Sequence, residues 1–190
     1  MSILRILQND FYGISKKSPS LLRMLLMCLI SNGWRAVLIY RFSQSVNERL
    51  GVLPARLLTS VSVWFTGAEL SPLSRIAPGL VIIHPNGIVV GDGVRAGSQL
   101  TIMQGVTLGE DYKIKNRGEY PNVGDAVTLC ANSSILGAIS IGNSTLVGAN
   151  SLVIDNLDPD SVYVGTPARK IGVVNREECY WRFFSDELTY

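Results

Sequence analysis

Aliphatic residues recur at every sixth position through most of the chain beyond residue 67, and no other feature restricts its fold as strongly. A unit of six fits neither an α-helix nor a flat amphipathic strand. It fits a short strand followed by a corner, with the aliphatic residue pointing inward. Stacked units would form aliphatic columns and a continuous core, so the period predicts a solenoid of parallel strands. The positions are Leu70, Ile76, Ile82, Ile88, Val94, Leu100, Val106, Val123, Leu129, Ile135, Ile141, Val147 and Val153.

One charged stretch, residues 110–121, interrupts this period. Val106 and Val123 are 17 residues apart where six are expected, so about eleven residues form an excursion. Long loops on a regular scaffold are usually functional. We therefore expect this loop to contribute to a binding site, although a structurally neutral insertion is the alternative.

The segment 1–66 differs from the repeats in both period and charge. Apolar residues recur at helical spacing from Ser18 to about Gly67, which predicts two or three short helices. Residues 1–66 hold eight Lys/Arg and two Asp/Glu, so their net charge is +6 although the whole chain carries +2. Such a segment can contact an anionic membrane surface, or its helices can pack against the base of the solenoid. We thus divide the chain into a helical segment (1–66), the solenoid (67–172) and a tail (173–190). A strand is expected after Arg169, followed by a short helix through Cys179 to Leu188.

Composition excludes several classes of protein. The chain is 47% hydrophobic, too apolar for a disordered protein. Three scattered cysteines form neither a disulfide framework nor a metal motif, which favours a reducing compartment. The longest charge-free apolar run, 24–34, is too short to span a bilayer, so we expect a cytoplasmic protein, with the inner face of the membrane as a second location. Motifs for nucleotide binding are lacking, and no nucleic-acid partner or metal is expected.

The repeats, the single loop and the closing segment 164–171 (VGTPARKI) together resemble the hexapeptide-repeat acyltransferases. This resemblance implies a left-handed parallel β-helix over residues 67–172. Within that family, 84–91 (HPNGIVVG) and 104–109 (QGVTLG) are similar to the serine acetyltransferase branch. That branch includes bacterial exopolysaccharide and colanic acid O-acetyltransferases, whose short helical segment is similar to the one here. The resemblance therefore implies an acetyl-CoA-dependent O-acetyltransferase.

Two positions shape the expectation for the acceptor. Serine acetyltransferases carry an Asp before the catalytic His and a second His after the loop, where this chain has Ile83 and Tyr120. An amino acid needs charged partners for its carboxylate and ammonium groups. We therefore expect a saccharide hydroxyl as acceptor, in capsule or exopolysaccharide biosynthesis. The alternatives are a serine O-acetyltransferase of cysteine biosynthesis and a non-catalytic β-helix subunit.

The resemblance places the general base at His84, the only histidine of the chain. A neutral imidazole suits removal of a hydroxyl proton near neutral pH. Glu69 matches the family's carboxylate that orients this base, with a solvated glutamate as the alternative. A single histidine excludes the three-histidine zinc site of the γ-class carbonic anhydrases, which share the scaffold.

The resemblance also implies where the two substrates bind. In the family, acetyl-CoA lies between neighbouring β-helices, which implies a homotrimer with active sites between subunits. The residues assigned to acetyl-CoA are Gly109, Ala131, Ala149, Arg169 and Lys170. The candidates for the acceptor site are Gln104, Tyr112 and Tyr120. Oxyanion donors are the Gln104 amide or backbone N–H groups near Gly105 or Gly109.

Overall fold

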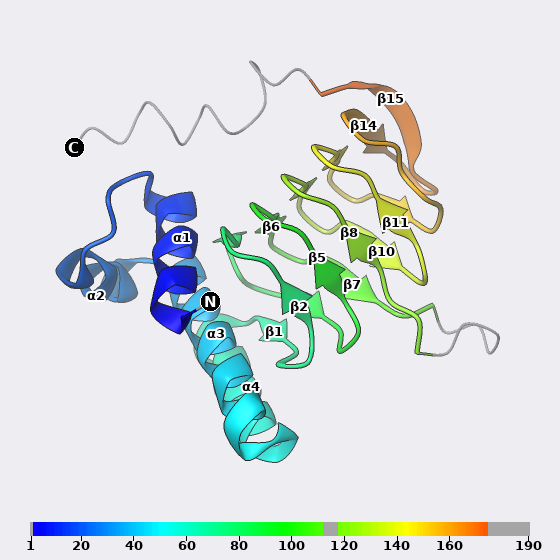
Figure 1. Ribbon diagram of the computed structural model, residues 1–190. Helices are drawn as coiled ribbons and strands as arrows, with labels where there is room; N and C mark the ends of the chain where they lie inside the picture. The colour runs from blue at the N-terminus through cyan, green and yellow to red at the C-terminus, as the bar shows by residue number, and fades with distance from the viewer. Residues whose placement is uncertain (1, 112–117, 175–190) are drawn as a thin grey trace.

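The computed structural model describes residues 2–111 and 118–174 and shows helices at one end of a β-solenoid (Figure 1). Four helices come first in the chain, and short connections of one to five residues separate them. They are α1 (Ile3–Ser15), α2 (Leu21–Ile30), α3 (Asn32–Leu50) and α4 (Val52–Thr66). Ser31 caps α3 through its side chain, and Gly51 separates α3 from α4.

Fourteen of the described strands form three parallel sheets, which are the three faces of the solenoid. Sheet A contains β1 (Glu69–Leu70), β4 (Val89–Val90), β7 (Thr107–Gly109), β10 (Ser134–Leu136) and β13 (Leu152–Val153). Sheet B contains β2 (Arg75–Ile76), β5 (Arg95–Ala96), β8 (Asn122–Val123) and β11 (Ser140–Ile141). Sheet C contains β3 (Val81–Ile83), β6 (Thr101–Met103), β9 (Thr128–Leu129), β12 (Leu146–Val147) and β14 (Ser161–Val164). The antiparallel strand β15 (Arg169–Val173) pairs with β14 and completes sheet C.

The predicted fold class is confirmed: the chain is a parallel β-helix of about four turns, matching the left-handed β-helix of acyltransferases. All thirteen residues of the six-residue period are buried, with at most 4% of each residue's surface exposed. Residues two positions before the strand anchors also point inward, among them Leu80, Ser133 and Thr145. Two inward residues per face explain why such short strands still enclose a continuous core.

The register of the strands differs from the sequence count in two places. Leu70 pairs with Val90, and Val90 in turn pairs with Leu108, so the first coil is longer than the second by two residues. Ile88, Val94, Leu100 and Val106 are consequently the inward residues that precede the strand anchors. Leu108 pairs with Ile135, 27 residues later, whereas a regular coil has 18 residues. The loop therefore inserts nine extra residues and not eleven.

Helix α1 was not predicted from the sequence, because no helix was expected before Ser18. Leu7 and Phe11 lie on the face of α1 that packs against the core, together with Ile14. Their spacing of three and four residues is the amphipathic signal that could have predicted this helix. The predicted strand after Arg169 is confirmed as β15, whereas the helix expected in the tail lies outside the described residues.

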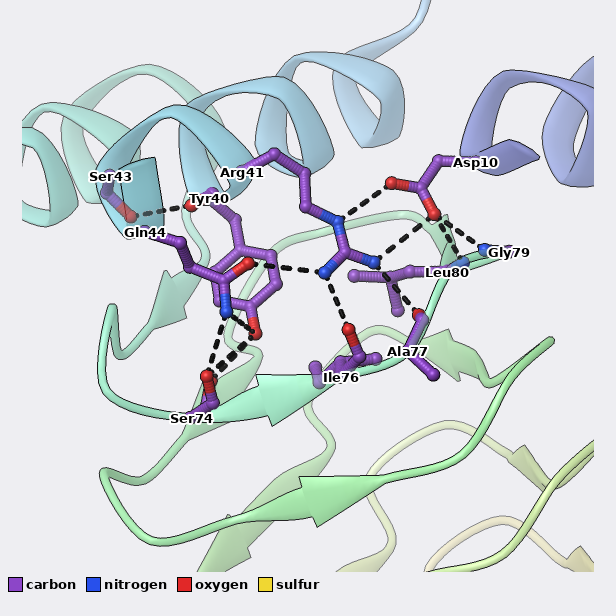
Figure 2. Close-up of polar contacts among 10 residues, drawn as sticks. All are labelled: Asp10, Tyr40, Arg41, Ser43, Gln44, Ser74, Ile76, Ala77, Gly79 and Leu80. Atoms are coloured by element: carbon purple, nitrogen blue, oxygen red, sulfur yellow. Dashed lines mark hydrogen bonds and ion pairs between the residues drawn. The ribbon is translucent and has the colours of Figure 1, made fainter. Parts of the chain in front are cut away.

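A buried ion pair attaches the helices to the first coil (Figure 2). Arg41 Nε of α3 lies 2.8 Å from Asp10 Oδ2 of α1, and both side chains are at most 3% exposed. Asp10 also accepts hydrogen bonds from the backbone N–H groups of Gly79 and Leu80, at 2.7 and 2.9 Å. Arg41 donates to the carbonyl oxygens of Ile76 and Ala77. We call these six residues the polar clamp, because together they join two helices to one corner of the solenoid.

Two glycines let the helices approach β3 closely. A Cβ atom on Gly33 of α3 would clash with the carbonyl oxygen of Ile82, and one on Gly13 would lie 3.0 Å from the Val81 side chain. Only glycine permits such an approach at Gly33. Since β3 leads directly into His84, the helices support the strand that holds the predicted base.

Candidate active site

His84 lies at the corner that joins sheet C to sheet A, directly after β3. Its side chain is exposed and its backbone is left-handed, with φ at 54°. Ile83 pairs with Met103 of the next coil, and the Gly105 N–H donates to the carbonyl oxygen of Asn86. Residues 84–86 therefore occupy the interval that Gln104 alone occupies in the next coil. This bulge accounts for the two extra residues and turns the histidine outward, as bulges near active sites commonly do.

The same corner brings several of the predicted residues into one column. Gln104 lies above the His84 bulge, and the Asn132 N–H donates to its carbonyl oxygen at 2.8 Å. Ala131 follows in the next coil, and the Asn150 N–H donates to its carbonyl oxygen at 2.9 Å, which places Ala149 above Ala131. Coils are about 4.8 Å apart. We call His84, Gln104, Ala131 and Ala149 the site column; they are far apart in the sequence, but the coils stack them.

Arg169 and Lys170 lie at the upper end of this column, on the exposed strand β15. The Ala168 N–H donates to the carbonyl oxygen of Leu152, directly above the corner that contains Ala149. Arg169 lies 3.6 Å from Asp155, and Lys170 lies 3.5 Å from Asp158, with all four side chains well exposed. Such exposed pairs hold their partners weakly, so both cations can bind an anionic group.

Glu69 lies on β1 of sheet A with its side chain exposed. Within the described residues no hydrogen bond joins it to His84, so the orienting role stays a prediction. Glu69 lines a recess of about 340 Å³ between α4 and sheet A, together with Arg56 and Trp64. Arg56 Nη2 lies 2.7 Å from Asp92 Oδ2, and Asp92 also accepts a hydrogen bond from Ser71. Nothing in the sequence pointed to Arg56 and Asp92, because only the packing of α4 beside sheet A brings Arg56 to Glu69 and to Asp92.

Gly109 and Tyr120 lie away from the site column, at the corner between sheets A and B. Gly109 ends β7 opposite Leu136. The ring of Tyr120 packs so closely on Gly91 and Gly93 that a Cβ atom on either glycine would clash with it. Within one chain, Tyr120 therefore does not reach His84. Tyr112, the third acceptor candidate, lies outside the described residues.

Comparisons with known proteins decide the family. No protein-family model matches the chain. The serine acetyltransferase of Helicobacter pylori strain 26695 is 34% identical over 170 residues, which are 90% of this chain and 94% of that protein. The chain belongs to the serine acetyltransferase family. Two solved structures agree, and each covers 90% of this chain: Brucella abortus serine acetyltransferase with coenzyme A (TM-score 0.81, 26% identity, 68% of that chain) and Neisseria gonorrhoeae serine acetyltransferase with serine (TM-score 0.79, 29% identity, 69% of that chain).

Family membership confirms part of the sequence interpretation and corrects another part. The chain is an O-acetyltransferase with acetyl-CoA as co-substrate, as expected. The placement nearest to exopolysaccharide O-acetyltransferases is wrong, and so is the saccharide acceptor, because the relatives at 30–34% identity are serine acetyltransferases. Ile83 and Tyr120 misled the interpretation: two positions say little about acceptor binding when other charged residues can surround the site.

Proposed function

We propose that this chain transfers the acetyl group of acetyl-CoA to the hydroxyl of L-serine. The observation that carries the proposal is the 34% identity to a serine acetyltransferase over 94% of that enzyme's length. Similarity over nearly the whole enzyme covers the helices as well as the solenoid. The acceptor is accordingly assigned from the whole chain and not from one motif.

His84 is the general base of the proposed reaction. Its imidazole accepts the proton of the serine hydroxyl while the serine oxygen attacks the thioester carbonyl. The carbon–sulfur bond then breaks, and the imidazolium returns its proton to the departing CoA sulfur. A positioned base of this kind typically raises the rate by about 10²- to 10⁴-fold. Glu69 serves as the positioning residue, which keeps the imidazole in one orientation.

The site column fits the extended arm of acetyl-CoA. Above His84 and Gln104 it presents only the methyl groups of Ala131 and Ala149, so an elongated chain can lie along the coils. Arg169 and Lys170 supply positive charge at the upper end for the phosphate groups. Gln104 lies in the coil above the bulge, and its side-chain amide is the proposed donor to the developing oxyanion.

The recess beside Glu69 offers charges for the amino acid itself. Serine carries a carboxylate and an ammonium group, and each needs an opposite charge when it leaves water. Arg56 and Glu69 both line this recess. In this proposal Arg56 binds the serine carboxylate. It supplies a charge that the uncharged Ile83 and Tyr120 cannot supply.

A homotrimer completes the proposed site. His84 and the described ends of the loop, residues 110–111 and 118–121, lie at different corners of one chain, and in the proposed trimer a neighbouring copy brings its loop to each histidine. Tyr120 is anchored on Gly91 and Gly93, where it holds the described end of the loop. Light scattering tests this point, because a stable monomer would contradict an active site between subunits.

The decisive experiment measures release of the CoA thiol from acetyl-CoA, with L-serine and a panel of saccharides as acceptors. We expect release with L-serine, and a loss of at least about 100-fold in His84→Ala. Gln99→Ala is the matched control, since Gln99 is also exposed and left-handed, with φ at 59°, but lies at another corner. Release without dependence on L-serine, or more than about a tenth of the activity in a folded His84→Ala variant, contradicts the proposal.

A further inference from the structure

Helix α2 exposes an aliphatic face that no described residue covers. Of its ten residues only Met24 is buried, whereas six aliphatic side chains are between 52% and 80% exposed. These six, which we call the α2 face, are Leu21, Leu22, Leu25, Leu26, Leu29 and Ile30. They repeat at spacings of four residues and so form one continuous stripe. Contiguous apolar surface of this kind marks an interaction site on a folded protein.

Positive charge borders the α2 face at both ends. Arg23, near the start of the helix, is exposed and donates to Ser18, and the exposed Lys17 precedes it. At the other end Arg35 Nη1 donates to the carbonyl oxygen of Cys28 at 2.9 Å. Residues 11–47 contain no Asp or Glu. Their other two basic residues are Lys16 and Arg41, and Asp10 neutralises Arg41. Within residues 11–47, the charged residues that flank the stripe are therefore all basic.

We infer that α2 docks this enzyme onto an anionic membrane surface. An aliphatic stripe between basic residues is the arrangement of a helix that lies in the lipid interface, with its apolar side among the acyl chains. The basic residues then meet negatively charged headgroups, each of which adds attraction. No single helix among the described residues is long and apolar enough to cross a membrane; α2 and α3 pass that test only as a pair, with a bend of 117° between them.

A second copy of the chain fits the α2 face less well. A two-fold contact brings the same patch of both copies together, so the basic residues that border the stripe, Lys17, Arg23 and Arg35, would meet basic residues of the other copy. Like charges at an interface oppose association. Helix α4 also exposes aliphatic residues, including Leu53 and Leu57, but its Arg56 is paired with Asp92 and lies in the same recess as the carboxylate of Glu69, so α4 offers less positive charge to anionic lipid.

Vesicle sedimentation of the full chain tests the inference independently of the acceptor. We expect binding to vesicles of phosphatidylglycerol and phosphatidylcholine, weaker binding at high salt, and little binding to phosphatidylcholine alone. The double variant Leu25→Gln/Leu29→Gln should bind at least about tenfold more weakly. The matched control is Leu53→Gln/Leu57→Gln, which removes two similarly exposed leucines from α4.

Three results would overturn the inference. The first is wild-type protein that does not sediment with the anionic vesicles. The second is an equal loss of binding in the α2 and α4 variants. The third is a smaller assembly of the α2 variant by light scattering, which would assign the face to a second copy. Circular dichroism confirms that each variant is folded, and serine-dependent thiol release is measured separately, so failure of the proposed function leaves this test intact.

Discussion

The helical cap and the solenoid reach stability by different means. In the solenoid the same aliphatic contact repeats from coil to coil, and residues such as Leu129 and Ile135 are fully buried. The cap depends on contacts that occur once: the Asp10–Arg41 pair and the close approach of Gly33 to Ile82. A repeated contact can lose one member and keep its neighbours. A contact that occurs once has no substitute.

The two regions also contribute differently to the active site: the solenoid contains the site residues, and the helical cap supports them. The site column belongs to the solenoid, and among the described residues the two-residue bulge at His84 is the only departure from regular coils on that corner. The cap touches the strand just before the bulge. The regular region thus presents the substrates, whereas the irregular region fixes the position of the base.

Asp10→Ala should produce the largest loss of stability. It leaves the Arg41 guanidinium, 3% exposed, without its countercharge, and such a loss typically costs about 3–5 kcal/mol. Urea unfolding followed by circular dichroism measures the free energy of unfolding. Glu48→Ala, which removes an exposed carboxylate of α3, is the control. A loss below about 1 kcal/mol in Asp10→Ala would remove the contrast between cap and solenoid.

Leu129→Ala tests the repeated contacts of the solenoid. Leu129 is fully buried in β9, and its truncation leaves a cavity that costs about 2–4 kcal/mol. The same unfolding measurement applies, with Leu53→Ala as a control, because that residue is 77% exposed. If the loss exceeds that of Asp10→Ala, the solenoid tolerates disruption less well than the cap.

Gly33→Ala links the cap to the site. The added methyl group must displace α3 or the Ile82 carbonyl, at a cost of about 1–3 kcal/mol. Since Ile82 lies two residues before His84, we also expect a several-fold lower kcat with little change in the KM for acetyl-CoA. Gly172→Ala is the control, because a Cβ atom there would contact nothing. Equal kcat values in the two variants would separate the cap from catalysis.

Asp125→Asn should have the smallest effect, confined to acid pH. The N–H and hydroxyl of Ser98 donate to Asp125, and these hydrogen bonds lower the pKa of its carboxyl below the usual 3.8. A lowered folded-state pKa gives stability that is present above pH 3.8 and is lost as the pH falls further. The wild type should therefore lose slightly more stability than the variant as the pH falls below this value, as measured by unfolding at several pH values. Identical pH profiles would contradict this role.

The sequence predicted the solenoid well because burial alone decides it. A six-residue aliphatic period has one common solution, a stack of coils, and all thirteen positions are buried. It also predicted the family's chemistry, since His84, Ala131 and Ala149 stand in recognisable motifs. The cytoplasmic location, the three-part division of the chain and the roles of the site residues stay predictions.

The tertiary structure decided what depends on contacts between distant segments. Only the strand register showed that two extra residues form the His84 bulge, because aliphatic residues two positions apart both point inward and hide the shift. Only packing joined Asp10 to Arg41 and Arg56 to Asp92, 31 and 36 residues apart. A periodic pattern records what is buried; it does not record which polar groups meet once the chain has folded.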